Sequence, residues 1–415
     1  MQIIEKLRLR AALASAFSPS APVRRIDLFS GRQSELDRLT EAVFQRGQHA
    51  AIYGERGVGK TSLANVLPEQ FEYLNRFDYQ VVRYSCSAVT TFNSIWDGIL
   101  RELTFKRNIA SSDSPPAPVP MNSYLPENAS PEDVRFLLQQ TGTPVVAVID
   151  EFECIPKDGT VSSLLAGTIK SLSDHAVDAT LIIVGVADSI DELIAEHRSV
   201  QRALVQIQMP RMTEKELLSV VEKGFQQAAM EIDLEAREQI SALSQGLPHN
   251  AHDLGLRTGY ACLEAGRLRA AKGDVELAIK QSVENAQQSM ASSYCKAVDS
   301  PHENIYKEIL LAAALASANE LGYFSAGELR KPLAIITGRD YGIDAYMKHL
   351  NSFCEESRGK LLERRGERRR YRFRFSDPIM EPYVILRGIA EGLISKDGAV
   401  ELESENFKAN SPSLF

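Results

Sequence analysis

The sequence predicts an α/β fold in which a parallel sheet is followed by a helical region and then by a small domain of helices and a hairpin. Three observations indicate this arrangement. Residues 49–62 have the pattern of a buried strand, a glycine-rich turn and the start of a helix. Residues 144–151 form an apolar run that ends in two carboxylates. Residues 305–375 have the pattern of three helices followed by two strands, which is typical of a winged helix.

Composition limits the class of protein. The chain has 415 residues, of which 44% are hydrophobic and 25% charged, as expected for a soluble protein of two or three domains. It has no apolar run of membrane-spanning length, and charged residues near Met1 argue against a secretory signal. The five cysteines are scattered without a C-x-x-C pair, which argues against zinc and disulfides. We therefore expect a cytoplasmic protein that makes no use of a membrane.

Residues 1–27 are expected to form an N-terminal helical arm. Apolar side chains recur at near-helical spacing between Ile3 and Phe17, and prolines at positions 19 and 22 then end the pattern. The apolar face of this arm can either pack on the body of the protein or dock a partner.

Residues 28–211 are expected to form the core, and the glycine-rich turn is its strongest motif. The pattern G-x-x-x-x-G-K-[ST] is met by Gly54, Gly59, Lys60 and Thr61. The glycines let backbone N–H groups point at phosphate oxygens, and the lysine places a positive charge on the β- and γ-phosphates. The threonine hydroxyl suits Mg²⁺, and the helix N-terminus faces the anion. The nucleotide-binding residues expected here are Gly54, Gly57, Val58, Gly59, Lys60, Thr61 and Ser62.

The apolar run 144–151 is the second strong motif and has the pattern of a Walker B motif. It predicts a strand buried on both faces, with Asp150 and Glu151 at the end where a parallel strand meets a nucleotide. We expect Asp150 to hold Mg²⁺ together with Thr61, and Glu151 to orient and deprotonate the attacking water. The alternative is a plain buried strand that ends in a solvated acidic turn.

Together these two motifs resemble those of the P-loop ATPases of the AAA+ and STAND groups, especially replication-initiator-like ATPases. The resemblance implies ATP and Mg²⁺ as cofactors and a parallel sheet of strand order 5-1-4-3-2. It implies that Arg32, in the segment Phe29–Leu39, borders the adenine. It also implies a sensor near the γ-phosphate at Asp188 or Ser189, after an apolar strand over residues 179–188. Arg202 would then reach the ATP of a neighbouring subunit, in an ATP-dependent homo-oligomer.

Residues 212–299 are expected to form a helical lid. Thr213 and Glu216 form a capping box at its first helix, and another helix is expected over residues 274–298. The segment Gly246-Leu-Pro248 resembles the G-x-P of STAND ATPases, which implies that Pro248 contacts the nucleotide. His249 stands where initiator ATPases commonly carry an arginine, and Arg257 is a candidate substitute cation.

Residues 300–390 are expected to form the winged helix, and residues 391–415 a C-terminal tail. The segment 358–374 holds nine basic and two acidic residues in a chain of net charge −8. Such a basic segment predicts contact with the backbone of double-stranded DNA. The alternatives are a solvated charge run and a surface that docks an acidic protein. The DNA contacts expected in the turn and second strand of the hairpin are Arg364, Arg365, Arg368, Arg369, Arg370 and Arg372.

Three functions fit these features. The first is an ATPase switch that binds and hydrolyses ATP and couples its nucleotide state to assembly on DNA. The second is a STAND-type signalling or antiphage-defence ATPase whose winged helix contacts an effector protein, for example a nuclease or transposase. The third is a nucleotide-dependent scaffold with little hydrolysis, which the intact Glu151 opposes.

Overall fold

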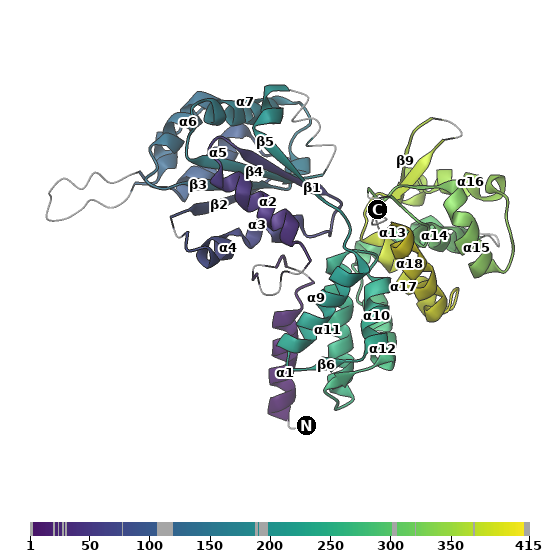
Figure 1. The fold of residues 1–415 in the computed structure, drawn as a ribbon. Coiled ribbons are helices and arrows are strands. Elements are labelled where there is room, and N and C mark those ends of the chain that lie inside the picture. Colours follow the sequence, from purple (N-terminus) through teal and green to yellow (C-terminus); the bar gives the residue numbers. More distant parts are fainter. Residues whose placement is uncertain are drawn as a thin grey trace. The chain divides into compact units, whose positions relative to one another are not determined.

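The computed structural model describes residues 3–19, 21–23, 25–26, 29, 31–76, 78–105, 119–186, 190, 198–300, 305–319, 321–367 and 370–410. These residues form two compact units (Figure 1). The first comprises residues 1–22, 55–58 and 210–415, and the second comprises residues 23–54 and 59–209. Each unit has its own hydrophobic core.

The second unit is built on a five-stranded sheet of order β2-β3-β4-β1-β5, in which every neighbouring pair is parallel. This is the predicted order 5-1-4-3-2. The strands are β1 (His49–Gly54), β2 (Gln80–Ser85), β3 (Val145–Asp150), β4 (Ala179–Gly185) and β5 (Leu204–Met209). All residues of β3 and β4 are buried, as their unbroken apolar sequences predict.

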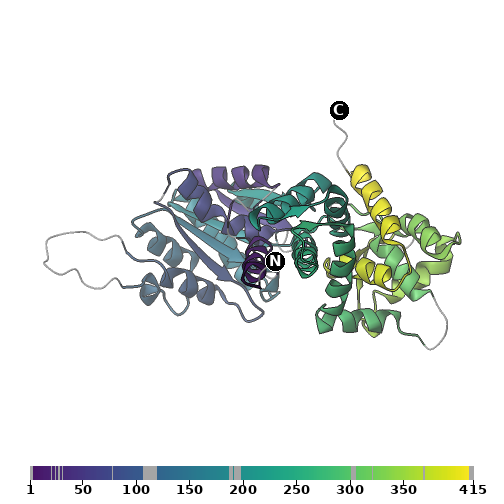
Figure 2. The same ribbon diagram turned by 90° about the horizontal axis from the view of Figure 1, so that it is seen from below.

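Helices cover both faces of this sheet (Figures 1 and 2). Side chains of α5 (Phe92–Arg101), α6 (Pro131–Gln139) and α7 (Thr160–Asp174) share one core with alternate residues of β3, among them Val145 and Ala147. The opposite face carries α2 (Gln33–Phe44), α3 (Lys60–Asn65) and α4 (Leu67–Tyr73). Short 3₁₀ turns lie at η1 (Met121–Tyr124), η2 (Phe152–Cys154) and η3 (Arg198–Arg202).

The first unit begins with α1 (Ile3–Ala16), which packs on α9 (Glu214–Gln227) and α11 (Pro248–Glu264). Phe17 fits against the helices because Gly224 has no side chain, and a Cβ there would lie 2.3 Å from the ring. The segment expected to form a lid also contains α10 (Leu234–Leu243) and α12 (Lys272–Glu284), and β6 (Glu231–Ile232) pairs in parallel with β7 (Arg269–Ala270). The predicted capping box of α9 is present, since Thr213 accepts a hydrogen bond from the backbone N–H of Glu216.

The C-terminal part of this unit has the element order of a winged helix. Helices α14 (Tyr306–Ala314), α15 (Arg330–Thr337) and α16 (Ile343–Ser352) accompany a three-stranded sheet of order β8-β10-β9. Its strands are β8 (Phe324–Ser325), β9 (Leu362–Arg365) and β10 (Arg372–Phe375), and 3₁₀ turns lie at η4 (Ala326–Leu329) and η5 (Glu356–Arg358). The sequence does not predict β8, because two residues carry no periodic signal.

Three further helices differ from expectation. Residues 274–298 are not one helix, because α12 ends at Glu284 and α13 (Gln288–Val298) starts after a break. Helix α17 (Met380–Ala390) follows the hairpin, and α18 (Lys396–Asn410) occupies most of the segment expected to be a tail. Ala399 and Leu402 of α18 are buried in the core of the first unit, which explains why that segment is folded.

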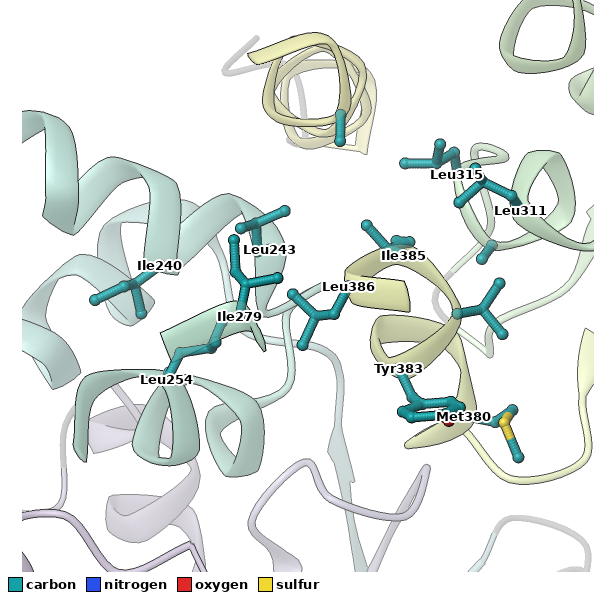
Figure 3. Close-up of a cluster of buried hydrophobic side chains, with 14 of the residues drawn as sticks. Ile240, Leu243, Leu254, Ile279, Leu311, Leu315, Met380, Tyr383, Ile385 and Leu386 are labelled. Atoms are coloured by element: carbon teal, nitrogen blue, oxygen red, sulfur yellow. The ribbon is translucent and has the colours of Figure 1, made fainter. Parts of the chain in front are cut away.

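Helix α17 joins the lid to the winged-helix elements in one hydrophobic core (Figure 3). Figure 3 shows Leu386 on the side of Leu243 and Ile279, whereas Ile385 lies on the side of Leu315. A Cβ at Gly388 would lie 2.7 Å from Leu311, so glycine permits the close approach of α17 to α14. Burial on several sides makes α17 the central helix of the first unit.

Candidate nucleotide-binding and metal site

The glycine-rich loop runs from the end of β1 to the start of α3. Gly54 passes so close to β5 that a Cβ would lie 2.3 Å from the carbonyl oxygen of Met209. Gly59 precedes α3 with φ of 99°, a left-handed conformation that favours glycine. Lys60 Nζ donates a hydrogen bond of 2.9 Å to the carbonyl oxygen of Gly54, which ties the two ends of the loop together. The backbone therefore has the tight turn that the motif requires.

Thr61 and Asp150 meet at the carboxyl end of the sheet. Thr61 Oγ1 donates a hydrogen bond of 2.9 Å to Asp150 Oδ2, and the backbone N–H of Glu151 donates one of 2.8 Å to Oδ1. Asp150 is only 3% exposed. These contacts fix the orientation of the carboxylate and leave the lone pairs of the threonine oxygen for a cation.

Hydroxyl and carboxylate oxygens are hard donors, and Mg²⁺ prefers one or two such protein ligands together with phosphate oxygens and water. No cluster of three histidine, cysteine or acidic side chains that could hold a metal occurs within the described part of the chain. Thr61 and Asp150 therefore fit a Mg²⁺ ion that arrives with a nucleotide.

Glu151 follows Asp150 with φ of 56°, a left-handed conformation that is uncommon for residues other than glycine. Its side chain is exposed, whereas Asp150 beside it is buried. Such backbone strain is often found at functional sites. The geometry leaves the carboxylate open to water at the end of β3, as a general base requires.

An arginine that the motif analysis did not single out completes this polar cluster. The guanidinium of Arg83, on β2, forms an ion pair with Asp150 Oδ2 and donates a hydrogen bond to Asn65 Oδ1 at the end of α3. In the sequence, Arg83 is marked only as the single charged residue of β2, the strand that lies next to β3 in the sheet. Its significance depends on the register of β2 against β3, which the sequence pattern does not give.

The other residues expected in the second unit stand as follows. Arg32 is 2% exposed, lies directly before α2 and donates a hydrogen bond of 3.2 Å to Glu35. Ser62 Oγ accepts a hydrogen bond of 3.1 Å from the backbone N–H of Val23. Arg202 is exposed at the end of η3, just before β5. Asp188 and Ser189 lie outside the described residues. The roles of all these residues remain predictions.

Within the first unit, residues 55–58 of the loop lie beside the G-x-P segment. A Cβ at Gly57 would lie 3.9 Å from Leu247 and 4.0 Å from the Cβ of His249, and Val58 is fully buried. Pro248 occupies the first turn of α11, where a missing N–H costs no hydrogen bond. The candidate cation Arg257 is instead held on α11, where its Nε lies 2.9 Å from both carboxylate oxygens of Asp253.

A buried ion cluster surrounds Arg211 in the same unit. Arg211 Nε lies 2.6 Å from Glu55 Oε2, and Nη2 lies 2.6 Å from Glu381 Oε2 on α17. Burial alone would lower the pKa of Arg211, but the carboxylates of Glu381 and Glu55 raise it. Burial also raises the pKa of Glu381, and Arg211 opposes that shift. One guanidinium thus compensates two buried carboxylates, a cluster that the sequence pattern did not reveal.

The basic hairpin differs in detail from expectation. Arg364 and Arg365 lie on β9 rather than in the turn. Side chains alternate along β10, because Phe373 and Phe375 are buried whereas Arg372 is exposed. Arg370, just before β10, is also exposed, and Arg364 lies over the ring of Tyr371. Arg368 and Arg369 lie outside the described residues.

Two other arginines of the segment make internal contacts. Arg374 lies 2.9 Å from Glu363 and over the ring of Tyr323. Arg358 donates to the carbonyl oxygen of Ala297 and lies over the ring of Tyr306. The charge open to a partner is therefore smaller than the sequence count suggests.

Comparison with known proteins gives a family. The family model described as "Novel STAND NTPase 1" matches residues 21–311, and no curated protein sequence matches the chain. Cdc6p from Pyrobaculum aerophilum is a similar solved structure, with a TM-score of 0.47, 18% identity and coverage of 92% of this chain and 98% of its own. ORC2 from Aeropyrum pernix has a TM-score of 0.48 and 14% identity, over 95% of this chain and 97% of its own. ORC1 from Aeropyrum pernix, solved in complex with DNA, has a TM-score of 0.47 and 16% identity, over 87% and 93%. Among the described residues, no helix is long and apolar enough to cross a membrane.

Proposed function

The chain belongs to the novel STAND NTPase 1 family, and from this membership we propose that it is an ATPase switch whose ATP-bound state assembles on double-stranded DNA. The chain is an ATPase. We further propose that it uses Mg²⁺, that it assembles in the ATP-bound state and that the assembly binds DNA. The observation that carries the proposal is the hydrogen bond of 2.9 Å between Thr61 and Asp150, which pairs a P-loop hydroxyl with a Walker B carboxylate.

The chemistry assigned to each residue follows from its position. Lys60 would neutralise the β- and γ-phosphates, and Thr61 with Asp150 would hold Mg²⁺, which supplies Lewis-acid stabilisation of the phosphates when bound. Glu151 would orient a water molecule and accept its proton, since its carboxylate is exposed beside the metal ligand. Arg202, exposed before β5, would act on the nucleotide of a neighbouring subunit.

The proposed DNA contacts rest on exposed arginines of the hairpin, among them Arg364, Arg370 and Arg372. Guanidiniums concentrated on one hairpin repel one another, and a polyphosphate backbone relieves this repulsion while it releases counterions. Contacts of this kind position a protein on DNA without reading its sequence.

The test uses the full-length Glu151→Gln variant, which should bind ATP without hydrolysing it. Light scattering in Mg²⁺ and ATP with a duplex should give particles that contain several protein copies, whereas ADP should give smaller ones. The same mass with ATP, ADP and no nucleotide would overturn the coupling of nucleotide state to assembly.

A second candidate is a STAND-type ATPase whose winged helix contacts an effector protein such as a nuclease or transposase. The observation in its favour is that Arg358 and Arg374 bind other groups of the same unit, which reduces the positive charge available to DNA. Absence of DNA binding at low salt, together with intact ATP hydrolysis, would favour this candidate.

A further inference from the structure

A positive charge lies beside Asp150, one of the two proposed Mg²⁺ ligands, and it belongs to neither of the two sequence motifs. Asp150 faces Ser85 across the parallel pair of β2 and β3. Because side chains two residues apart on a strand share a face, Arg83 lies on the same face of the sheet as Asp150. The Asp150 side chain is 4% exposed and that of Arg83 is 31% exposed, so their ion pair is only partly screened by water.

Arg83 is also held from a second direction. Its other terminal nitrogen donates to Asn65, the last residue of the helix that begins with Lys60 and Thr61. The guanidinium thus bridges Asp150 and the far end of the P-loop helix. Asp150 Oδ2 accepts hydrogen bonds from both Thr61 and Arg83, so the carboxylate has a full positive charge beside it before a metal ion binds.

We propose that Arg83 is a positioning residue that neutralises Asp150 and thereby limits how strongly Mg²⁺ is linked to nucleotide binding. The inference rests on the proposed Mg²⁺ site at Thr61 and Asp150. In the absence of metal, Arg83 removes the repulsion that a bare carboxylate would exert on the phosphates. With Mg²⁺ present, the positive charge of Arg83 repels the metal ion. Both effects reduce the benefit that Mg²⁺ gives to nucleotide affinity.

The measured quantity is the ratio of the dissociation constant of fluorescent ATPγS in EDTA to that in saturating Mg²⁺, by equilibrium anisotropy with the full-length protein. Arg83→Met should raise this ratio at least about fivefold, since a partly buried ion pair is lost next to the metal. Asn65→Ala should raise it less, because the guanidinium then loses only one of its two anchors. Arg83→Lys should stay near the wild-type ratio, since it keeps the charge.

Arg135→Met is the matched control, because Arg135 on α6 pairs with Glu132 and has no contact with Asp150 in the described structure. Its ratio should equal that of the wild type. Arg83→Met with an unchanged or smaller ratio would overturn the inference, and so would an Arg83→Lys ratio as high as that of Arg83→Met. If the wild type and Asp150→Asn both bind without any effect of Mg²⁺, the metal site itself is wrong and the inference falls with it.

Discussion

Thr61 Oγ1 lies 2.9 Å from Asp150 Oδ2, although the two residues are 89 positions apart in the sequence. The contact joins the start of α3 to the end of β3, two elements whose sequence motifs were recognised separately. Their meeting follows from the parallel sheet, because the carboxyl ends of all its strands lie at one edge. Catalysis is therefore expected at this edge of the sheet.

Glu151→Gln should lower kcat at least about a hundredfold, because the amide cannot accept the proton of the attacking water, and nucleotide affinity should remain. Steady-state phosphate release and anisotropy with fluorescent ATPγS separate the two effects. Glu153→Gln is the matched control, since Glu153 is exposed in the same short turn and should retain activity. A Glu151→Gln rate close to that of the wild type would remove the proposed role of the base.

Arg202→Ala should lose hydrolysis yet regain part of it when mixed with Lys60→Ala. Each protein then supplies what the other lacks at mixed interfaces, because the arginine would act on the nucleotide of a neighbour. Phosphate release is measured at equal total concentration for each variant alone and for the mixture. A wild-type enzyme that is monomeric by light scattering under conditions in which phosphate release is at its full rate would exclude action between subunits.

Arg211→Met should destabilise the first unit by about 3 kcal/mol, since it removes the guanidinium that pairs with the buried carboxylates of Glu55 and Glu381. Thermal denaturation followed by circular dichroism measures the loss. A variant that also carries Glu55→Gln and Glu381→Gln should recover much of it. Unchanged stability of Arg211→Met would show that the cluster contributes little to the fold.

Glu403, on α18, makes stability depend on pH. Burial, together with the nearby charge of Glu381, raises the pKa of Glu403 to about 8 from an ordinary 4.5. Between these two pKa values the folded protein retains a proton that the unfolded chain releases. The contribution of Glu403 to the free energy of unfolding is therefore present at low pH and is lost as pH rises through about 8.

Glu403→Gln should therefore raise Tm by roughly 3–6 °C at pH 9 and change it little at pH 5. Glu405→Gln, two residues further on the same helix and exposed, serves as the control. Equal effects of Glu403→Gln at both pH values would contradict the shifted pKa.

The parts of the fold that could be predicted are those with a local signal. The apolar run 144–151 identified β3, and the glycine pattern placed the loop between β1 and α3. Because the carboxyl ends of parallel strands lie at one edge of the sheet, Thr61 was expected to lie near Asp150. Each of these steps uses residues close in sequence or a general property of parallel sheets.

The parts that could not be predicted depend on contacts between distant segments. The ion pair of Arg83 with Asp150 requires the register of β2 against β3. The cluster around Arg211 joins residues 55, 211 and 381. Helix α18 has too weak an apolar pattern to be recognised, and it is held by burial of Ala399 and Leu402 in a core contributed by other helices.

The exposed arginines of the hairpin are expected to bind the backbone of double-stranded DNA. Arg365→Ala, Arg370→Ala and Arg372→Ala together should weaken duplex binding similarly on every sequence, because phosphate contacts do not read bases. The control variant removes three exposed arginines elsewhere, Arg46, Arg101 and Arg269, whose side chains are 68%, 67% and 66% exposed. It has the same net charge as the hairpin variant, so a difference between the two reports on position rather than on total charge.

Fluorescence anisotropy of a labelled duplex, with the full-length protein in ATP at several salt concentrations, tests the central claim most directly. If about four arginines touch phosphates, log K should fall with log salt at a slope of roughly −3 to −4 for the wild type and the control variant. The hairpin variant should reduce the magnitude of that slope by roughly two to three. Absent binding, or a hairpin variant with the affinity and slope of the control, would contradict assembly on DNA through this hairpin.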